Sequence, residues 1–336
     1  MYCCSNCFSD AFLESVIAQN SKKTGDCNFC DTKDISLIHA EELIDYFQPL
    51  FDLYEVTKSG GKSISSLLKK DWKLFIYIDE DKTVKLLESI FDLELNQLFS
   101  PKKNNDEAKI LNWQDFKKEL KHFNRYFPQK APSYEHLNGL LQFITLPNKE
   151  VPKNLFRARV NIDTSKIDIE NMGKPPEKKS TAGRANPIGI PYLYTASNSQ
   201  TAIAEIRPDK GDTITVAKFE VNDTLSLADL RNPRQSISPF ALDENGLNQI
   251  FADLDYLCHL GDELFKPILP REANLEYLSS QYLCELIKHC GFDGVVYKSS
   301  VGDGDNYAIF SDSKLKAIEI EVYIVEDIEI LSSKIN

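Results

Sequence analysis

The spacing of apolar residues changes once along this chain of 336 residues, and that change limits the folds open to it. Before Pro128 the apolar side chains recur at the three- and four-residue intervals of amphipathic helices. After Pro152 they gather in short runs, and residues 213–221 alternate apolar and polar side chains as a half-buried strand does. Prolines cluster between these two positions, where we expect a domain boundary.

Each part can be divided into expected elements. Three apolar stripes of the first part are expected to pack as a small helical bundle, at residues 43–54, 87–95 and 113–123. Pro49 is expected to kink or break the first helix. The second part predicts a helix at 275–290, capped by Gly291. Its strand-like runs lie at 155–160, 193–196, 213–221, 294–297 and 308–310. Because helices and strands interleave irregularly, the predicted class is α+β rather than doubly wound α/β.

The net charge of −12 argues against a broadly basic surface of the kind that binds nucleic acid or anionic membranes. A basic strip of Lys117, Lys118, Lys121 and Arg125 falls on an expected helix and is interpreted as a solvated face. No run of roughly 18 apolar residues predicts a membrane span. The first residues lack the charged start and apolar stretch of a secretory signal. We therefore expect a cytoplasmic protein without a membrane or nucleic-acid partner.

Five of the eight cysteines lie within the first thirty residues. Cys4-x-x-Cys7 and Cys27-x-x-Cys30 form two pairs, and two such pairs can complete a tetrahedral metal site. In a reducing compartment this pattern indicates metal ligation before a disulfide. We predict a structural zinc ion in residues 1–35, with Cys3 as an alternative ligand to Cys4. The other interpretation is a tail of reduced thiols.

The segment from Gly183 to Ala196 reads Gly-Arg-Ala-Asn-Pro-Ile-Gly-Ile-Pro-Tyr-Leu-Tyr-Thr-Ala. Its glycines and prolines predict an irregular loop that runs into a strand, and such loops let a fixed arginine approach a ligand. Arg184 is therefore a candidate for a bidentate contact to phosphate. A structural loop in which Arg184 forms a local salt bridge explains the pattern equally well.

A short helix is expected after that strand. Ser197 or Asn198 would cap it, and it would end before Pro208. Glu205 falls in the last turn, where a carboxylate opposes the helix dipole. Glu205 would either face a sugar or form an ion pair with Arg207 or another basic group.

Charged and polar residues also mark both ends of the second part. Arg157 and Arg159 alternate on an expected strand, so they share one face, which suits a pyrophosphate or buried salt bridges. Ser299, Ser300 and Asn306 flank a loop rich in glycine and aspartate. The loop lacks the spacing of a calcium site, and ordinary turn chemistry also explains its polar residues.

In this order, these pieces resemble the RES domain, a family named for an arginine, a glutamate and a serine. Its pattern is an aromatic residue with arginine, then GR-x-NP-x-G-x-P-x-LY-x-A, then a helix with A-x-x-E, and finally a serine and an asparagine. The resemblance covers roughly residues 150–325. The matching positions are Phe156 and Arg157 with Arg159 as second choice, residues 183–196 including Tyr194, Glu205, Ser299 or Ser300, and Asn306.

The resemblance implies an ADP-ribosyltransferase-like RES domain at residues 150–330 that consumes NAD as its substrate. Known activities of the family are NAD hydrolysis and NAD phosphorolysis. Its members are commonly toxins that a DNA-binding antitoxin holds inactive. The implied partners are therefore NAD and a protein antitoxin or immunity partner.

The resemblance also implies roles for the site residues. Glu205 would stabilise the positive charge that develops as the nicotinamide–ribose bond breaks. Arg157 and Arg184 would bind the pyrophosphate, with Arg159 as a further candidate. Tyr194 would stack on the nicotinamide ring or bond a ribose hydroxyl. The groups expected to orient the ribose or the attacking group are Ser299 or Ser300, and Asn306.

The N-terminal part resembles the HEPN/RES N-terminal domain that is fused to some RES domains. The predicted organisation is a zinc-binding unit at 1–35, a mainly helical domain at 36–145 and the RES domain at 150–330. No R-x4-6-H motif predicts a nuclease. Two other functions are a transferase that attaches ADP-ribose to a macromolecule and a non-enzymatic, zinc-containing interaction module. Residue types leave open whether water or phosphate is the acceptor.

Overall fold

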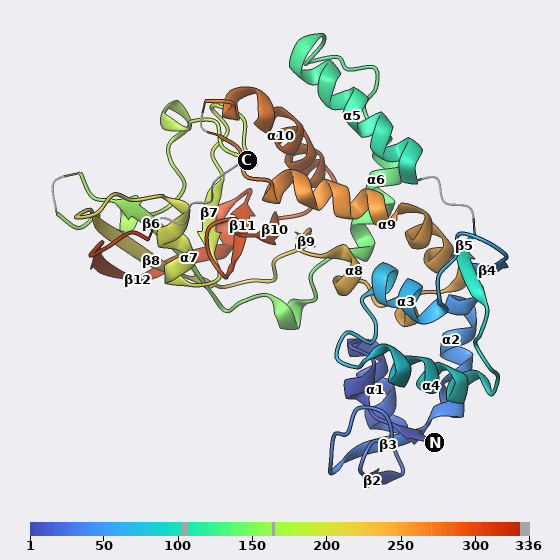
Figure 1. Ribbon diagram of the computed structural model, residues 1–336. Helices are drawn as coiled ribbons and strands as arrows, with labels where there is room; N and C mark the ends of the chain where they lie inside the picture. The colour runs from blue at the N-terminus through green and yellow to red at the C-terminus, as the bar shows by residue number, and fades with distance from the viewer. Residues whose placement is uncertain (103–105, 163–164, 270, 330–336) are drawn as a thin grey trace. The chain divides into compact units, whose positions relative to one another are not determined.

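The computed structural model describes residues 1–102, 106–162, 165–269 and 271–329 (Figure 1). The chain forms two compact units, each composed of two stretches of sequence. The first unit comprises Met1–Ile110 and Asn232–Cys258, and the second comprises Leu111–Arg231 and His259–Asn336. The expected division at 1–35, 36–145 and 150–330 stays a prediction.

The first unit combines short helices with two small sheets. Its three-stranded sheet has the order β1-β3-β2, and its second sheet is a hairpin of β4 and β5. The strands are β1 (Tyr2–Cys3), β2 (Lys23–Gly25), β3 (Ile35–His39), β4 (Tyr54–Thr57) and β5 (Leu98–Pro101). The helical segments are η1 (Ser5–Cys7), α1 (Ala11–Asn20), η2 (Ala40–Leu43), α2 (Ile44–Phe51), α3 (Ile64–Trp72), α4 (Glu80–Phe91), α8 (Pro233–Ser236) and η6 (Pro239–Ala241).

Aromatic side chains fill much of the core of this unit. The ring of Phe47 lies 5.7 Å from that of Phe8 and 6.1 Å from that of Phe75. α2 runs from Ile44 through Pro49 to Phe51, so the expected break at the proline is wrong, and the helix is shorter than its apolar stripe. Tyr54 belongs to β4, so a purely helical bundle was wrong here.

The second unit is built on a seven-stranded sheet of order β12-β8-β6-β7-β11-β10-β9. Neighbouring strands are antiparallel, except for the parallel pair of β9 and β10. All five expected strands are present, and β9 and β12 add to them. The strands are β6 (Asn154–Val160), β7 (Leu193–Ala196), β8 (Thr213–Val221), β9 (Leu227–Asp229), β10 (Gly294–Lys298), β11 (Asp305–Ile309) and β12 (Leu315–Ile324). The mixed architecture confirms the α+β class.

The helix expected at 275–290 is confirmed as α10, and Gly291 follows it with a φ of 91°. The helices of this unit are α6 (Tyr134–Phe143), α7 (Ser199–Glu205) and α10 (Ala273–His289), with short turns η3 (Asn148–Glu150), η4 (Ile169–Asn171), η5 (Glu177–Lys179) and η7 (Asp312–Lys314). Two further helices, α5 (Asp106–His122) and α9 (Glu244–Phe265), have residues in both units. Within the described ranges, none of the helices has the length and apolar character needed to cross a bilayer.

The basic strip on α5 differs from the expected solvated face. Lys117 forms an ion pair with Glu263 at 2.6 Å, and Lys121 forms one with Glu276 at 2.7 Å. Phe123, which was expected to belong to a buried stripe, lies just beyond the end of α5 and is 76% exposed. Charge pairing therefore accounts for part of this strip.

Small side chains allow α7 to lie close to the sheet. Ala202 of α7 is buried in one cluster with Ala158 of β6 and Ala196 of β7. Alanine side chains permit the backbones to approach each other without leaving voids. This packing brings the last residue of α7, Glu205, beside strands that are distant in sequence.

Candidate active site

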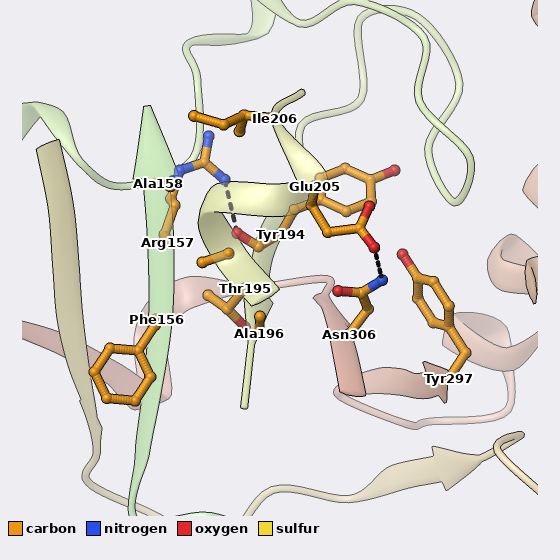
Figure 2. A pocket seen from close by; sticks show the side chains of 11 residues that line it. Phe156, Arg157, Ala158, Tyr194, Thr195, Ala196, Glu205, Ile206, Tyr297 and Asn306 are labelled. Atoms are coloured by element: carbon orange, nitrogen blue, oxygen red, sulfur yellow. Dashed lines mark hydrogen bonds between the residues drawn. The ribbon is translucent and has the colours of Figure 1, made fainter. Parts of the chain in front are cut away.

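A cavity of about 180 Å³ lies between α7 and the strands β6, β7, β10 and β11 (Figure 2). Its walls combine apolar side chains with a few polar and charged groups, the usual character of a small-molecule site. The lining residues are Phe156, Arg157, Ala158, Tyr194, Thr195, Ala196, Ala202, Glu205, Ile206, Tyr297 and Asn306.

Glu205 reaches this cavity from the end of α7. The helix begins at the Asn198 cap, whose side chain accepts a hydrogen bond from the backbone N–H of Thr201 at 2.8 Å. Oε1 of Glu205 accepts hydrogen bonds from Oγ of Ser299 and Nδ2 of Asn306, each at 2.6 Å. Oε2 has no partner among the described residues. The carboxylate is thus oriented at one oxygen and free at the other.

The expected ion pair between Glu205 and Arg207 is absent from the described residues. Arg207 lies two positions beyond the end of α7 and has a φ of 46°, in the left-handed region. Its side chain is exposed. The position of Glu205 is instead explained by the two neutral donors that meet its carboxylate.

Ser299 is held in place by its own hydrogen bonds. It follows β10 directly, and its Oγ accepts bonds from the backbone N–H groups of Val301 at 3.2 Å and Gly302 at 2.9 Å. Neither Ser299 nor Ser300 is among the residues that line the cavity, and the hydrogen bond to Glu205 comes from Ser299. Of the two serines that the sequence left as alternatives, Ser299 is therefore the one that contacts Glu205.

Asn306 and Tyr297 lie side by side on the β10–β11 hairpin. They are register partners, and Asn306 also faces Ala196 across to β7. Both side chains are buried, with 6% and 5% exposed. Tyr297 was not predicted as a site residue. The hairpin register could have identified it, because the loop between the two predicted strands places Tyr297 opposite Asn306.

Arg157 is a half-buried cation in the cavity wall. Its Nη1 donates to the backbone oxygen of Tyr194 at 3.1 Å, and its Nε is buried with no partner in the described part of the chain. Burial, reinforced by the nearby charge of Arg159, lowers the pKa of Arg157 to about 10. The group is still protonated at neutral pH. Because a buried charge without a counter-ion is unfavourable, the cavity favours an anionic ligand.

A family model described as the RES domain matches residues 155–331, more than half of the chain. The chain belongs to the RES domain family. Among solved structures, the M. tuberculosis MbcT–MbcA toxin–antitoxin complex is similar at 14% identity, over 55% of this chain and 92% of that chain, with a TM-score of 0.34. No curated protein matches the chain. The model does not extend into the N-terminal part, where the HEPN/RES resemblance stays a prediction.

Two arginines of the predicted site lie away from the cavity of the RES domain. Arg159 is exposed, and its Nη1 donates to the backbone oxygen of Asn171 at 2.6 Å. Arg184 donates through Nη1 to the backbone oxygen of Lys266 at 2.7 Å and lies 5.4 Å from the ring centre of Tyr277. Neither lines the cavity, so their contacts with phosphate stay predictions.

Residues 183–196, which match the central block of the RES pattern, hold their own loop together by hydrogen bonds. The hydroxyl of Tyr194 donates to Oδ1 of Asn186 at 2.8 Å and accepts from the backbone N–H of Ala185 at 2.9 Å. A Cβ added at Gly183 would lie 2.5 Å from both Oδ1 of Asn186 and the Tyr194 hydroxyl. The hydrogen bond between Asn186 and Tyr194 therefore needs the space that the missing side chain of Gly183 leaves. The ring of Tyr194 still lines the cavity.

The N-terminal cysteines form a candidate metal centre. The sulfur atoms of Cys4, Cys7, Cys27 and Cys30 all lie within 4.8 Å of one another. Cys3 is not part of this set, because its thiol donates to the backbone oxygen of Ile38 at 3.8 Å. Four converging thiols from two C-x-x-C pairs suit the tetrahedral sulfur coordination of zinc. The donor set therefore fits a structural metal ion.

Proposed function

We propose that this protein cleaves the nicotinamide–ribose bond of NAD in the cavity of its RES domain. The observation that carries the proposal is the pairing of two groups at one cavity. Glu205 presents an oriented carboxylate with one free oxygen, and Arg157 presents a half-buried cation whose buried Nε has no partner among the described residues. A dinucleotide supplies partners for both, because its pyrophosphate is anionic and its ribose becomes positively charged as the bond breaks.

The reaction follows from these charges. Nicotinamide is cationic in NAD and leaves with the electrons of the glycosidic bond as a neutral molecule. Positive charge moves onto the ribose, where the Glu205 carboxylate stabilises it. Water then bonds to the ribose carbon and releases a proton, or phosphate bonds there instead. The products are nicotinamide with ADP-ribose, or nicotinamide with ADP-ribose phosphate.

Ser299 and Asn306 act through Glu205 in this scheme. The Ser299 hydroxyl donates a hydrogen bond to Oε1 of Glu205 and accepts two from backbone N–H groups. We therefore assign Ser299 and Asn306 as positioning residues that fix the carboxylate. Arg157 would bind the pyrophosphate or another anionic part of the substrate.

Product analysis tests the proposal. The purified full chain is incubated with NAD, with and without phosphate, and nicotinamide and the ADP-ribose products are quantified. Nicotinamide should appear, Glu205→Gln should abolish its release, and the effect of phosphate should identify the acceptor. Glu220→Gln is the matched control, because Glu220 is an exposed residue of β8 outside the cavity. No release under either condition would refute the proposal, and labelled ADP-ribose on a macromolecule would assign a transferase.

Loss of NAD would harm the cell that makes such an enzyme, so we also propose a toxin that is controlled by a protein antitoxin. Induced expression of the wild-type chain should stop growth and lower cellular NAD. Expression of Glu205→Gln to the same level should do neither. Equal growth arrest by both chains would contradict NAD consumption as the cause.

A further inference from the structure

Tyr297 has a hydroxyl that the folded chain does not use. Only 5% of the residue is exposed, yet the hydroxyl has no hydrogen-bond partner among the described residues. Buried tyrosines ordinarily find a partner for this group. Tyr54 and Tyr192, which are also buried, each donate to a carboxylate at 3.1 Å.

The free hydroxyl faces the cavity. Tyr297 is one of the lining residues, and Figure 2 shows its hydroxyl directed toward the end of the Glu205 side chain and the amide of Asn306. The amide nitrogen of Asn306 donates to Oε1 of Glu205, while its Oδ1 makes no hydrogen bond within the described residues. Oε2 of Glu205 and the hydroxyl of Tyr297 are an acceptor and a donor that a ligand can use together on this side.

These two groups have complementary hydrogen-bonding roles. Burial, and then the charges of neighbouring groups that include Glu205, raise the pKa of Tyr297 well above its ordinary value. Its hydroxyl is consequently a neutral donor at physiological pH, whereas an ionised carboxylate only accepts. A ligand hydroxyl fits between them, because it can accept from Tyr297 and donate to Glu205 at the same time.

We infer that Tyr297 is a substrate-binding residue that donates a hydrogen bond to a ribose hydroxyl, which in turn donates to Glu205. This inference rests on the proposed function, since it assumes that the ribose next to the breaking bond lies at Glu205. The contact joins substrate recognition to the orientation of the carboxylate. It also selects a ribose over a sugar that lacks this hydroxyl.

Tyr194 provides a matched control. Both tyrosines line the cavity, but Tyr194 is half-buried, and its hydroxyl makes two hydrogen bonds within its own loop. Tyr297→Phe removes a hydroxyl without a protein partner, so its melting temperature should equal that of the wild type. Tyr194→Phe removes the hydroxyl that bonds Oδ1 of Asn186 and the backbone N–H of Ala185, so its melting temperature should fall.

The decisive measurement compares substrates. Nicotinamide release by wild type and Tyr297→Phe is measured with NAD and with two analogues, each lacking one hydroxyl of the nicotinamide ribose. With NAD, Tyr297→Phe should lower kcat/KM about tenfold, the effect of one lost hydrogen bond of roughly average strength. With the analogue that lacks the hydroxyl bound by Tyr297, the wild type and the variant should have the same kcat/KM. A ratio that is the same for all three substrates would overturn the inference.

A measurement of ADP-ribose binding tests the role of Tyr297 independently of whether the protein cleaves NAD. Failure of the wild type to release nicotinamide would refute the function, and ADP-ribose affinity, measured by calorimetry, would then decide the role of Tyr297. Tyr297→Phe should bind ADP-ribose about tenfold more weakly than the wild type, because the terminal ribose keeps its hydroxyls. Equal affinities, or no binding by the wild type, would overturn the assignment.

Discussion

Ser299→Ala tests how the site orients its carboxylate. The substitution removes the hydroxyl that donates to Oε1 of Glu205 at 2.6 Å and accepts from the backbone N–H groups of Val301 and Gly302. Ser300→Ala makes the same chemical change one position later, at a half-buried residue that does not line the cavity. The pair therefore isolates the contact with Glu205 from the loss of a serine in this loop.

The expected size of the effect follows from these contacts. A hydrogen bond to a charged group contributes about 1.5 to 3 kcal/mol. We take the lower end, because Glu205 is exposed to solvent and Asn306 keeps its own bond to Oε1 at 2.6 Å. About 1.5 kcal/mol corresponds to roughly a tenfold loss in kcat/KM. The same energy lowers the melting temperature by roughly 3 to 6 °C for a unit of this size.

Nicotinamide release and thermal unfolding, measured on both variants, check these values. Ser299→Ala should lose activity about tenfold and melt a few degrees lower, while Ser300→Ala should match the wild type in both assays. A larger loss of activity in Ser300→Ala would refute the assignment. An unchanged kcat/KM in Ser299→Ala would show that Asn306 alone orients the carboxylate.

Four further predictions concern the cysteine cluster, Gly183 and Arg157. Cys4→Ser should lose bound zinc and melt at a lower temperature, as should the wild type treated with a chelator. Cys3→Ser should keep one zinc per chain, measured by elemental analysis. Equal zinc content in both variants would contradict the ligand set. Gly183→Ala should lower the melting temperature by a few degrees, because its Cβ would lie 2.5 Å from the Tyr194 hydroxyl, and an unchanged value would mean that the loop adapts freely. Arg157→Met should abolish NAD turnover without lowering the melting temperature, since it removes a half-buried charge whose buried Nε has no partner among the described residues. Retained turnover would contradict its role. The pKa of Arg157 is lowered to about 10, so binding of an anionic ligand that depends on this charge should weaken as pH rises through that value. The contribution of Arg157 to folding stability should rise over the same range, because the arginine of the unfolded chain keeps its proton to higher pH.

Most of the local structure could be predicted from the sequence. The strands β7 and β8 have the expected bounds, and α10 lies within two residues of its expected ends. Apolar periodicity and capping residues are local properties, so they can be identified without a fold. Tyr54 and Phe123 were assigned wrongly, because periodicity shows which residues share a face and not where that face is covered.

The composition of the site was only partly predictable. Order along the chain identified Arg157, Glu205 and Asn306, which line one cavity. It did not reveal that the guanidinium of Arg184 donates to the backbone of Lys266 and does not line the cavity, and it missed Tyr297. Residue types alone do not reveal whether a polar side chain is already occupied by the protein or free for a ligand.

By itself, the amino-acid sequence determined the α+β class, the family pattern and the two C-x-x-C pairs, because each depends on residues close together in the chain or on their order. Tertiary structure showed that Ser299 rather than Ser300 contacts Glu205, and that Cys4 rather than Cys3 belongs to the cluster of four thiols. Those choices depend on contacts over long separations, such as the 94 positions between Glu205 and Ser299 and the 26 positions between Cys4 and Cys30. Only the packing of α7 on the sheet and the register of the β10–β11 hairpin bring such residues together.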